Sequence, residues 1–281
     1  MKNYTEFIIS FHPFIPDIVT GLLWELNISG ITENDNSIIV YSDSEFSISK
    51  EQIEDILQNL KSERIINDFS VEQHLVADRN WNEEWEKNIN IIKTGSRFVI
   101  KPSFRNYIPE PGEIVITIDP KMSFGTGEHP TTKLMLQMID KFVKDGMRVI
   151  DVGSGTAVLA IAAVMSGAAS AIAIDNDQWC YENGIENCKL NKVQDKIEVK
   201  LASIENISGK NFDLIAANIQ KDVLLNISDE IYDKLKEGGT AILSGLLKDD
   251  ENEINRKYYS SGFNLISKKQ MDEWIALVFR K

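Results

Sequence analysis

Two short stretches of the sequence combine residue types that could hold a small ligand and orient it for reaction. In the first, residues 151–157 read DVGSGTA, between an apolar run typical of a strand and one typical of a helix. Glycine lets a backbone turn sharply and approach a ligand closely. The bare N–H groups at a helix start favour polar ligand atoms. The pattern predicts a nucleotide- or nucleoside-binding loop.

The spacing of the glycines distinguishes two kinds of ligand. A dinucleotide-binding loop of the form GxGxxG would have its third glycine where this chain has Val158, so a site for a pyrophosphate is disfavoured. A nucleoside cofactor without phosphates instead needs an acidic residue after the second strand, to hold its ribose. Asp175 lies 22 residues after Gly153, and a carboxylate accepts two hydrogen bonds from a vicinal diol. Asp177 is the nearby alternative, beyond the expected strand end.

A second polar residue is expected at the same edge of the sheet. Residues 212–217 form an apolar strand-like run that ends at Asn218. Ligands of open parallel sheets lie at the carboxyl ends of the strands, and an amide offers both donors and acceptors. Asn218 is therefore a candidate for orienting a ligand. The alternative is an Asx cap on the helix that follows.

The second stretch, residues 122–132, reads MSFGTGEHPTT. It combines two glycines, an aromatic ring and hydroxyl groups at the start of a predicted helix. This composition is typical of a binding loop or a lid. The alternative is an ordinary loop that caps the helix.

The elements that must position these residues alternate between strand and helix along most of the chain. From residue 148 onward the alternation predicts a parallel sheet with helices on both faces and an antiparallel pair of strands at its end. The expected strands are 98–100, 114–118, 149–152, 171–174, 197–201, 212–217, 240–243, 263–266 and 274–279, and the expected helices are 130–143, 157–165, 178–191 and 221–235.

The first 78 residues differ in pattern and in charge. Their hydrophobic spacing predicts a βαββαβ order, which suggests a small ferredoxin-like α+β domain. They carry 14 acidic and 4 basic residues, so most of the net charge of −13 lies in this part. Beyond it, Trp81, Trp85 and Ile89 repeat every four residues. This predicts a short helix, which is either a packed strut between domains or an aromatic wall near a site.

Composition narrows the class of protein. The 281 residues are 43% hydrophobic and 26% charged, as in a soluble globular protein, and the charge of −13 disfavours non-specific nucleic-acid binding. Two cysteines and three distant histidines predict neither a disulfide framework nor a metal site. The polar start lacks an export signal, and the alanine-rich window 156–174 is interpreted as a core helix and strand. A cytoplasmic protein without membrane contact is expected.

Taken together, the motifs resemble the PrmA family, the methyltransferases of large-subunit ribosomal protein eleven. The resemblance is carried by FGTG at 124–127 with HPTT at 129–132, by DVGSG at 151–155 and by ANI at 217–219. WNEEWE at 81–86 is similar to the interdomain segment of that family. Many methyltransferases share the glycine motif, whereas the combination of FGTG and HPTT is far more specific.

The resemblance implies a fold, a division into domains and an activity. The fold would be α/β, a class I, Rossmann-like methyltransferase domain with a small N-terminal ferredoxin-like α+β domain. Residues 1–78 would recognise the substrate, 79–96 would link the domains, and 97–281 would be catalytic. The enzyme would transfer methyl groups from S-adenosyl-L-methionine to lysine side-chain and α-amino nitrogens of the basic ribosomal protein, without direct contact with nucleic acid.

Five residues match the family's cofactor contacts: Thr132, Gly153, Gly155, Asp175 and Asn218. Asn218 is also the candidate for orienting the substrate amine, and no metal is implied.

The sequence departs from the family's usual pattern at Glu128, Ser154, Thr156-Ala157 and Gln220-Lys221. None of these positions is one of the five cofactor contacts. Residues 202–203 offer no aspartate for the adenine amino group, so that contact has no candidate.

Three alternatives stay open from the residues alone. A class I methyltransferase acting on another protein, a small molecule or nucleic acid would share the same motifs, although the charge of −13 disfavours nucleic acid. A nicotinamide-dependent oxidoreductase is disfavoured by Val158. A non-enzymatic module that binds a basic ribosomal protein is disfavoured by the presence of Gly153, Gly155 and Asp175.

Overall fold

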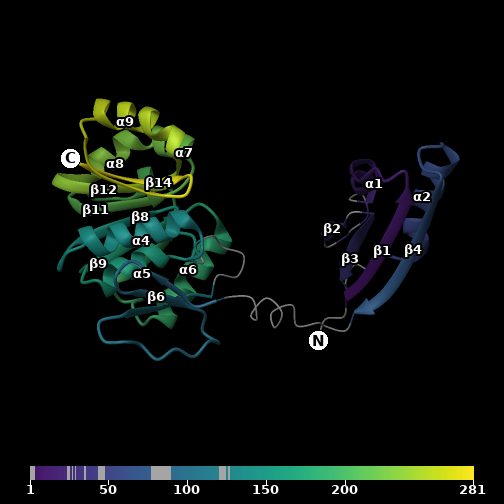
Figure 1. The fold of residues 1–281 in the computed structure, drawn as a ribbon, viewed down its shortest axis with the longest axis horizontal. Helices are drawn as coiled ribbons and strands as arrows, with labels where there is room; N and C mark the ends of the chain where they lie inside the picture. Colours follow the sequence, from purple (N-terminus) through teal and green to yellow (C-terminus); the bar gives the residue numbers. More distant parts are fainter. Residues whose placement is uncertain are drawn as a thin grey trace. The chain divides into compact units, whose positions relative to one another are not determined.

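The computed structural model divides into two compact units, Met1–Asn88 and Ile89–Lys281 (Figure 1). The predicted helix around Trp81 and Trp85, and Phe124 and Thr126 of the FGTG motif, lie outside the described residues. No helix among the described residues is long and apolar enough to cross a membrane. The structure describes residues 4–23, 26, 28, 30–34, 36–43, 48–76, 90–119, 125 and 127–281.

The first unit is a four-stranded antiparallel sheet in the order β2-β3-β1-β4 with two helices, a ferredoxin-like arrangement. Alternate residues of the central strands are buried, as a sheet with one covered face requires. They pack with Val19 of α1 and with Ile53 and Leu57 of α2. Along the chain the elements are β1 (Tyr4–His12), α1 (Pro16–Leu23), β2 (Gly30–Asn34), β3 (Ser37–Asp43), α2 (Lys50–Ser62) and β4 (Asp68–Val76).

A small sheet precedes the main one in the second unit. It contains β5 (Ile92–Thr94), β6 (Phe98–Lys101) and β7 (Ile114–Thr117) in that order. β6 and β7 run parallel, and β7 lies at the edge of this sheet. The chain then leads through Asp119 toward α4 (Pro130–Phe142), which begins at the HPTT motif.

The main sheet has seven strands in the order β10-β9-β8-β11-β12-β14-β13. The first five strands in this order are parallel, and β14 is antiparallel to both of its neighbours. The winding of the chain reverses between β8 and β11, where ligands of doubly wound folds bind. The bounds are β8 (Arg148–Val152), β9 (Ser170–Asp175), β10 (Ile197–Leu201), β11 (Phe212–Asn218), β12 (Leu235–Leu247), β13 (Asn264–Met271) and β14 (Trp274–Arg280).

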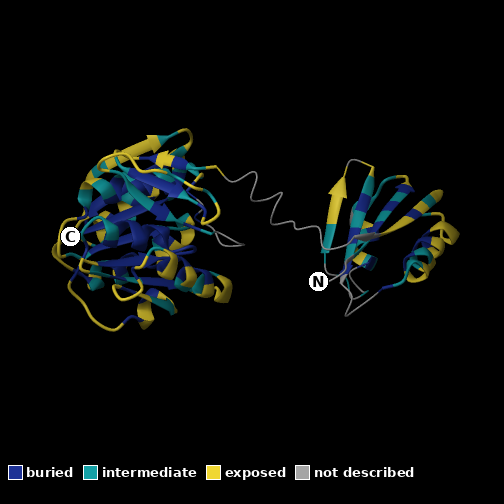
Figure 2. Ribbon diagram, turned by 90° about the horizontal axis from the view of Figure 1, so that it is seen from below, coloured by how far each residue is buried: buried dark blue, intermediate teal, exposed yellow. Residues whose placement is uncertain are grey.

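Helices cover both faces of this sheet (Figure 1). On one face lie α4, α5 (Val158–Met165) and α6 (Gln178–Leu190), and on the other lie α7 (Lys221–Asn226), α8 (Ser228–Lys234) and α9 (Glu251–Ser260). Successive residues of a strand point to opposite faces of the sheet and so belong to two different hydrophobic cores. Val149 and Leu214 belong to the first core, and Ile150 and Ile215 to the second. The central strands are therefore buried on both sides (Figure 2).

Two details differ from the sequence prediction. The single helix expected over residues 221–235 is two helices, and Leu235 already begins β12. The break lies at Ile227, where φ is −95° and ψ is 11°, and the next hydroxyl, that of Ser228, donates to the Leu225 carbonyl at 3.3 Å. Such side-chain bonds compete with a regular helix. β5, α9 and the short helical turns η1 (Ile204–Asn206) and η2 (Lys248–Asp250) were not predicted.

Candidate functional site

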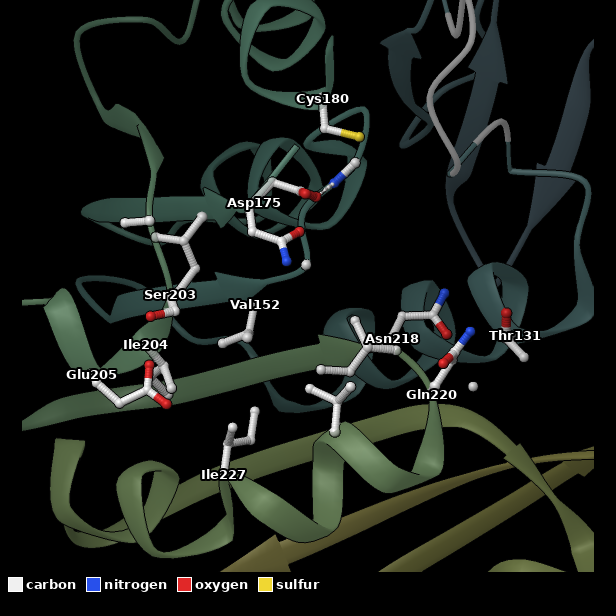
Figure 3. Close-up of a pocket in the computed structure, with 18 of the residues that line it drawn as sticks. Thr131, Val152, Asp175, Cys180, Ser203, Ile204, Glu205, Asn218, Gln220 and Ile227 are labelled. Atoms are coloured by element: carbon white, nitrogen blue, oxygen red, sulfur yellow. Dashed lines mark hydrogen bonds between the residues drawn. The ribbon is translucent and has the colours of Figure 1, made fainter. Parts of the chain in front are cut away.

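A cavity of about 650 Å³ opens at the carboxyl ends of β8, β9, β10 and β11. This edge contains the point where the chain winding reverses, and the volume lies in the usual range for small-molecule sites. Ser203 and Glu205 lie toward one end of the cavity, and Asn218, Gln220 and Thr131 toward the other, with Asp175 between the two groups (Figure 3). The cavity therefore suits an elongated ligand with a different polar group at each end.

The glycine loop, residues 153–157, turns sharply beneath this cavity. Gly153 and Gly155 both line it, with φ of 67° and 52°. A Cβ atom at Gly153 would collide with the Ile219 side chain. Only glycine fits such a left-handed, crowded position without strain. Both glycines predicted from the sequence are thus where a ligand can approach the backbone.

Asp175 ends β9 with its carboxylate at the cavity. One oxygen accepts from the Gly155 N–H at 2.8 Å and the other from the Asp177 N–H at 3.1 Å. A carboxylate has about four acceptor positions, so capacity remains for a ligand. Asp177 has a different role, because it caps α6 by accepting from the N–H groups of Trp179 and Cys180. Asp175 therefore lines the cavity, and Asp177 is not among the residues that line it.

Asn218 ends β11, where it pairs with Ser244 of β12, and it lines the cavity. The alternative, a cap on the following helix, does not apply: the residue at the N-cap of α7 is Gln220. Asn218 lies beside Gln220 on the side of the cavity away from Ser203 and Glu205 (Figure 3).

Thr132 does not line the cavity. It is buried in the first turn of α4, and its hydroxyl has no hydrogen-bond partner among the described residues. The preceding residue, Thr131, lines the cavity instead, together with His129, whose ring nitrogen caps α4 by accepting from the Thr131 N–H at 3.3 Å. The His129 ring also packs edge-on against Trp274 of β14, with centroids 4.9 Å apart.

The residues at one end of the cavity were not predicted from the sequence. After β10 the chain folds into η1 and brings Ser203, Ile204 and Glu205 to the cavity wall. The turn is tied to the neighbouring strand, because the Ala202 N–H donates to the Asp175 carbonyl at 2.8 Å. The signal was available: these residues directly follow a predicted strand, as Asn218 does.

A buried acid lies behind the glycine loop. Asp151 is fully buried, with one oxygen accepting from the Ala160 N–H at 3.0 Å and the other unpartnered among the described residues. Burial raises its pKa to about 7; the negative charge of Asp175 acts in the same direction, and the Ala160 bond opposes it. Burial beside Asp151 also raises the pKa of the Cys188 thiol to about 12. A cationic ligand nearby would favour the ionised form of Asp151.

Within the described part of the chain, no group of three His, Cys, Asp or Glu side chains could hold a metal ion. The site consists of backbone N–H groups, the carboxylates of Asp175 and Glu205, amide and hydroxyl side chains, and apolar walls. Such a set can bind and orient a nucleoside cofactor, while the reactivity must come from the cofactor itself.

The chain is similar to proteins of one family, in sequence and in structure. The family model described as "Ribosomal protein L11 methyltransferase (PrmA)" matches residues 25–281. A ribosomal protein L11 methyltransferase of Acetivibrio thermocellus is 38% identical over 72% of this chain and 64% of its own length. That of Brevibacillus brevis is 29% identical over 94% of this chain and 95% of its own length. A solved ribosomal protein L11 methylase from Lactobacillus delbrueckii subsp. bulgaricus is 31% identical, with a TM-score of 0.64 over 68% of this chain and 98% of that one.

Proposed function

The chain belongs to the ribosomal protein L11 methyltransferase family, and from this premise we propose that it transfers methyl groups from S-adenosyl-L-methionine to lysine side-chain and α-amino nitrogens of ribosomal protein L11. The family resemblance read from the motifs is thereby confirmed, as is the Rossmann-like α/β fold. The single observation that carries the proposal is the position of Asp175, fixed between the glycine loop and the cavity.

Asp175 and the residues from it toward Ser203 and Glu205 fit the nucleoside part of this cofactor. Asp175 has the free acceptor positions that a ribose diol needs, and Gly153 and Gly155 leave the backbone open to it. Ile174, Ile204 and Ile227 give this region apolar walls suited to a flat purine, while Ser203 and Glu205 are the candidates for its amino group. The adenine contact that the sequence left without a candidate is thus proposed in η1.

The opposite end suits the amine. Asn218 and Gln220 offer amide oxygens and Thr131 offers a hydroxyl, at the side of the cavity away from the proposed adenine site. We assign Asn218 to orienting the attacking nitrogen: its side-chain oxygen would accept a hydrogen bond from one N–H group of the amine. Of the five cofactor contacts inferred from the family, Gly153, Gly155, Asp175 and Asn218 line the cavity, whereas Thr132 is buried beside it and its neighbour Thr131 lines the cavity.

The chemistry is a displacement: the amine, after losing a proton to water, would form a bond from nitrogen to the methyl carbon as the carbon–sulfur bond breaks and the neutral thioether leaves. Bound S-adenosylmethionine supplies a methyl group on a positive sulfur. The amine must be neutral to attack, and deprotonating a lysine at pH 7 costs about 4.6 kcal/mol. The apolar walls of Val152, Val223 and Ile219 lower the amine pKa by desolvation. Holding the amine in line supplies much of the remaining acceleration, so no dedicated base is assigned.

The same proposal gives the two units separate roles, substrate binding and catalysis. Residues 1–78, with 14 acidic and 4 basic residues, would dock the basic substrate and contribute no chemistry. Residues 79–96 would link this unit to the catalytic residues 97–281. Cys180 and Cys188 form no disulfide, which fits a reducing compartment, and we place the reaction in the cytoplasm with no direct contact with nucleic acid.

Mass spectrometry of purified L11 after incubation with the enzyme and S-adenosylmethionine tests the proposal. The expected result is L11 heavier by whole methyl groups, at amine nitrogens, with no change when the cofactor is omitted. Unmodified L11 alongside a methylated second protein or small molecule would favour the alternative substrate class. Failure of the chain to bind S-adenosylmethionine in calorimetry would refute methyl transfer altogether.

Replacing Asn218 by Ala tests the orienting role. We expect turnover at saturating cofactor to fall about 100-fold, the usual effect of removing one preorganised polar contact. Asn226→Ala, at an exposed position in the last turn of α7, is the matched control and should leave turnover unchanged. Near-normal methylation by the Asn218 variant would contradict the assignment.

A further inference from the structure

Three asparagines on one face of the α6 region bind backbone groups of another segment through their side-chain amides. Asn183, Asn187 and Asn191 are four residues apart, so they lie above one another along the helix. Asn183 and Asn187 are almost completely buried, at 2% and 0% exposure. Buried amides are costly unless they are hydrogen-bonded, and each of these makes specific bonds. We call the three residues the asparagine ladder.

The ladder binds the backbone at the end of β7. The Asn191 amide accepts from the Thr117 N–H at 2.8 Å and donates to the Thr117 carbonyl at 2.6 Å, as a neighbouring strand would. Asn187 accepts from the Asp119 N–H at 3.0 Å, and Asn183 donates to the Asp119 carbonyl at 2.8 Å. Residues Thr117 and Asp119 are thus held to α6 by their main chain.

Only one member of the ladder also reaches the glycine loop. The Asn187 amide donates to the Thr156 carbonyl at 3.1 Å, and the Thr156 hydroxyl donates to the Gly125 carbonyl at 2.9 Å. Thr156 is fully buried. Through Asn187 and Thr156, the glycine loop is therefore hydrogen-bonded to both Asp119 and Gly125, the described residues on either side of segment 120–124.

This connection ends at the proposed cofactor site. Thr156 directly follows Gly155, whose N–H donates to the Asp175 carboxylate at 2.8 Å. A shift of Thr156 would therefore move the N–H that orients Asp175. The fit is also tight on the other side, because a Cβ atom at Gly125 would lie 2.7 Å from the Thr156 hydroxyl oxygen.

We propose that Asn187 and Thr156 are positioning residues for the cofactor: they fix the glycine loop, and through it Gly155 and Asp175, against Asp119 and Gly125. The inference deepens the proposed function and depends on it. Asn191 contributes stability only, because its bonds hold β7 and α6 together and none of them reaches the glycine loop.

The test compares two pairs of variants of the full chain by calorimetric titration with S-adenosylmethionine. Thr156→Val keeps the side-chain shape and removes the hydroxyl, and we expect it to weaken cofactor binding at least about 10-fold, with Thr156→Ser within about 3-fold of the wild type. Asn187→Ala should weaken binding by at least the same factor, whereas Asn191→Ala should change it less than about 2-fold. Urea unfolding of each variant gives its stability, and titrations are made where all are fully folded.

A positioning role predicts that affinity does not follow stability across these variants. Turnover at saturating cofactor should change less than the KM for the cofactor in Thr156→Val. Equal weakening by Asn187→Ala and Asn191→Ala, or wild-type affinity in Thr156→Val, would overturn the inference. If Asn187→Ala does not fold, the Thr156 pair decides alone. A wild-type chain that fails to bind S-adenosylmethionine would refute the proposed function instead, so the two failures are distinguishable.

Discussion

The two units of the chain contain the same kinds of elements but differ in where their strands end. In Met1–Asn88 neighbouring strands run in opposite directions, so their carboxyl ends are divided between two edges of the sheet. In Ile89–Lys281 β8 to β12 are parallel, and their carboxyl ends meet at one edge. Asp175 and Asn218 come from different strands and still share one cavity. A site assembled from several strand ends needs the second arrangement.

The same comparison applies to charge. The first 78 residues carry a balance of −10, and the remaining residues carry −3. Acidic surface attracts a basic protein at a distance, whereas the cavity works by a few fixed contacts. The units would therefore contribute recognition and chemistry separately, and this separation can be tested from both sides.

Deleting residues 1–78 should have the largest effect. The first unit has its own hydrophobic core, formed around Phe7, Ile38 and Leu57, so the second unit should fold without it. We expect methylation of L11 to be lost, while calorimetry shows S-adenosylmethionine binding close to that of the full chain. Methylation that survives the deletion would show that the first unit does not dock the substrate.

Asp175→Ala should have the next largest effect, confined to the second unit. Removing a carboxylate that would accept two hydrogen bonds from the ribose should weaken cofactor binding about 100-fold or more, which corresponds to about 3 kcal/mol. Asp177→Ala is the matched control, two residues away. It removes a helix cap, so it should lower stability by about 1 kcal/mol and change cofactor affinity only a few-fold, as measured by calorimetry and urea unfolding.

Gly245→Ala tests the crowding at the carboxyl edge. Gly245 lines the cavity with φ of 82°, and a Cβ atom there would lie 2.8 Å from the Ile219 carbonyl carbon. We expect a loss of about 3 kcal/mol in the free energy of unfolding, from the backbone conformation and the clash together. Gly238, near the other end of β12, has φ of 72° and nothing within 4 Å. Gly238→Ala should therefore cost only about 1 kcal/mol, and equal losses in urea denaturation would exclude crowding as the cause.

The smallest effect concerns the buried Asp151. Its pKa is about 7 in the folded chain and about 3.9 when unfolded, so the folded state binds the extra proton between these values. Proton binding by Asp151 therefore favours the folded state. This contribution to the free energy of unfolding is fully present below about pH 4 and is lost as the pH rises through 7. Between pH 5 and 7 the wild type should lose about 2 kcal/mol relative to Asp151→Asn, which cannot ionise. Urea unfolding of both proteins without cofactor measures this, and parallel pH profiles would contradict it.

The sequence predicted the second unit best where strands and helices alternate. Its parallel sheet and antiparallel end follow from apolar runs separated by amphipathic ones, and Asp175 and Asn218, which line the cavity, were proposed as site residues because they end such runs. The prediction of one helix over 221–235 was wrong because Ser228 interrupts an otherwise regular pattern. α9 escaped notice because only Ile254 and Tyr258 of its residues are buried.

Contacts between distant segments were harder to predict. Thr132 and Thr131 are adjacent hydroxyl residues, and only the direction of the first turn of α4 decides which one faces the cavity. The asparagine ladder has a visible spacing, but its partners Thr117 and Asp119 lie more than sixty residues away along the chain. Nothing local to α6 indicates which backbone those amides bind.

The order β12-β14-β13 has a consequence for the synthesis of the chain. β14 separates two strands that precede it, so β12 exposes a long unpaired edge, and β13 has no neighbour in the main sheet, until Trp274–Arg280 has left the ribosome. Trp274, which borders the cavity, arrives with that last strand. A chain that ends before residue 274 would therefore lack part of the cavity wall and would be prone to aggregate through the exposed edge of β12. We expect such truncated chains to be inactive and to be degraded.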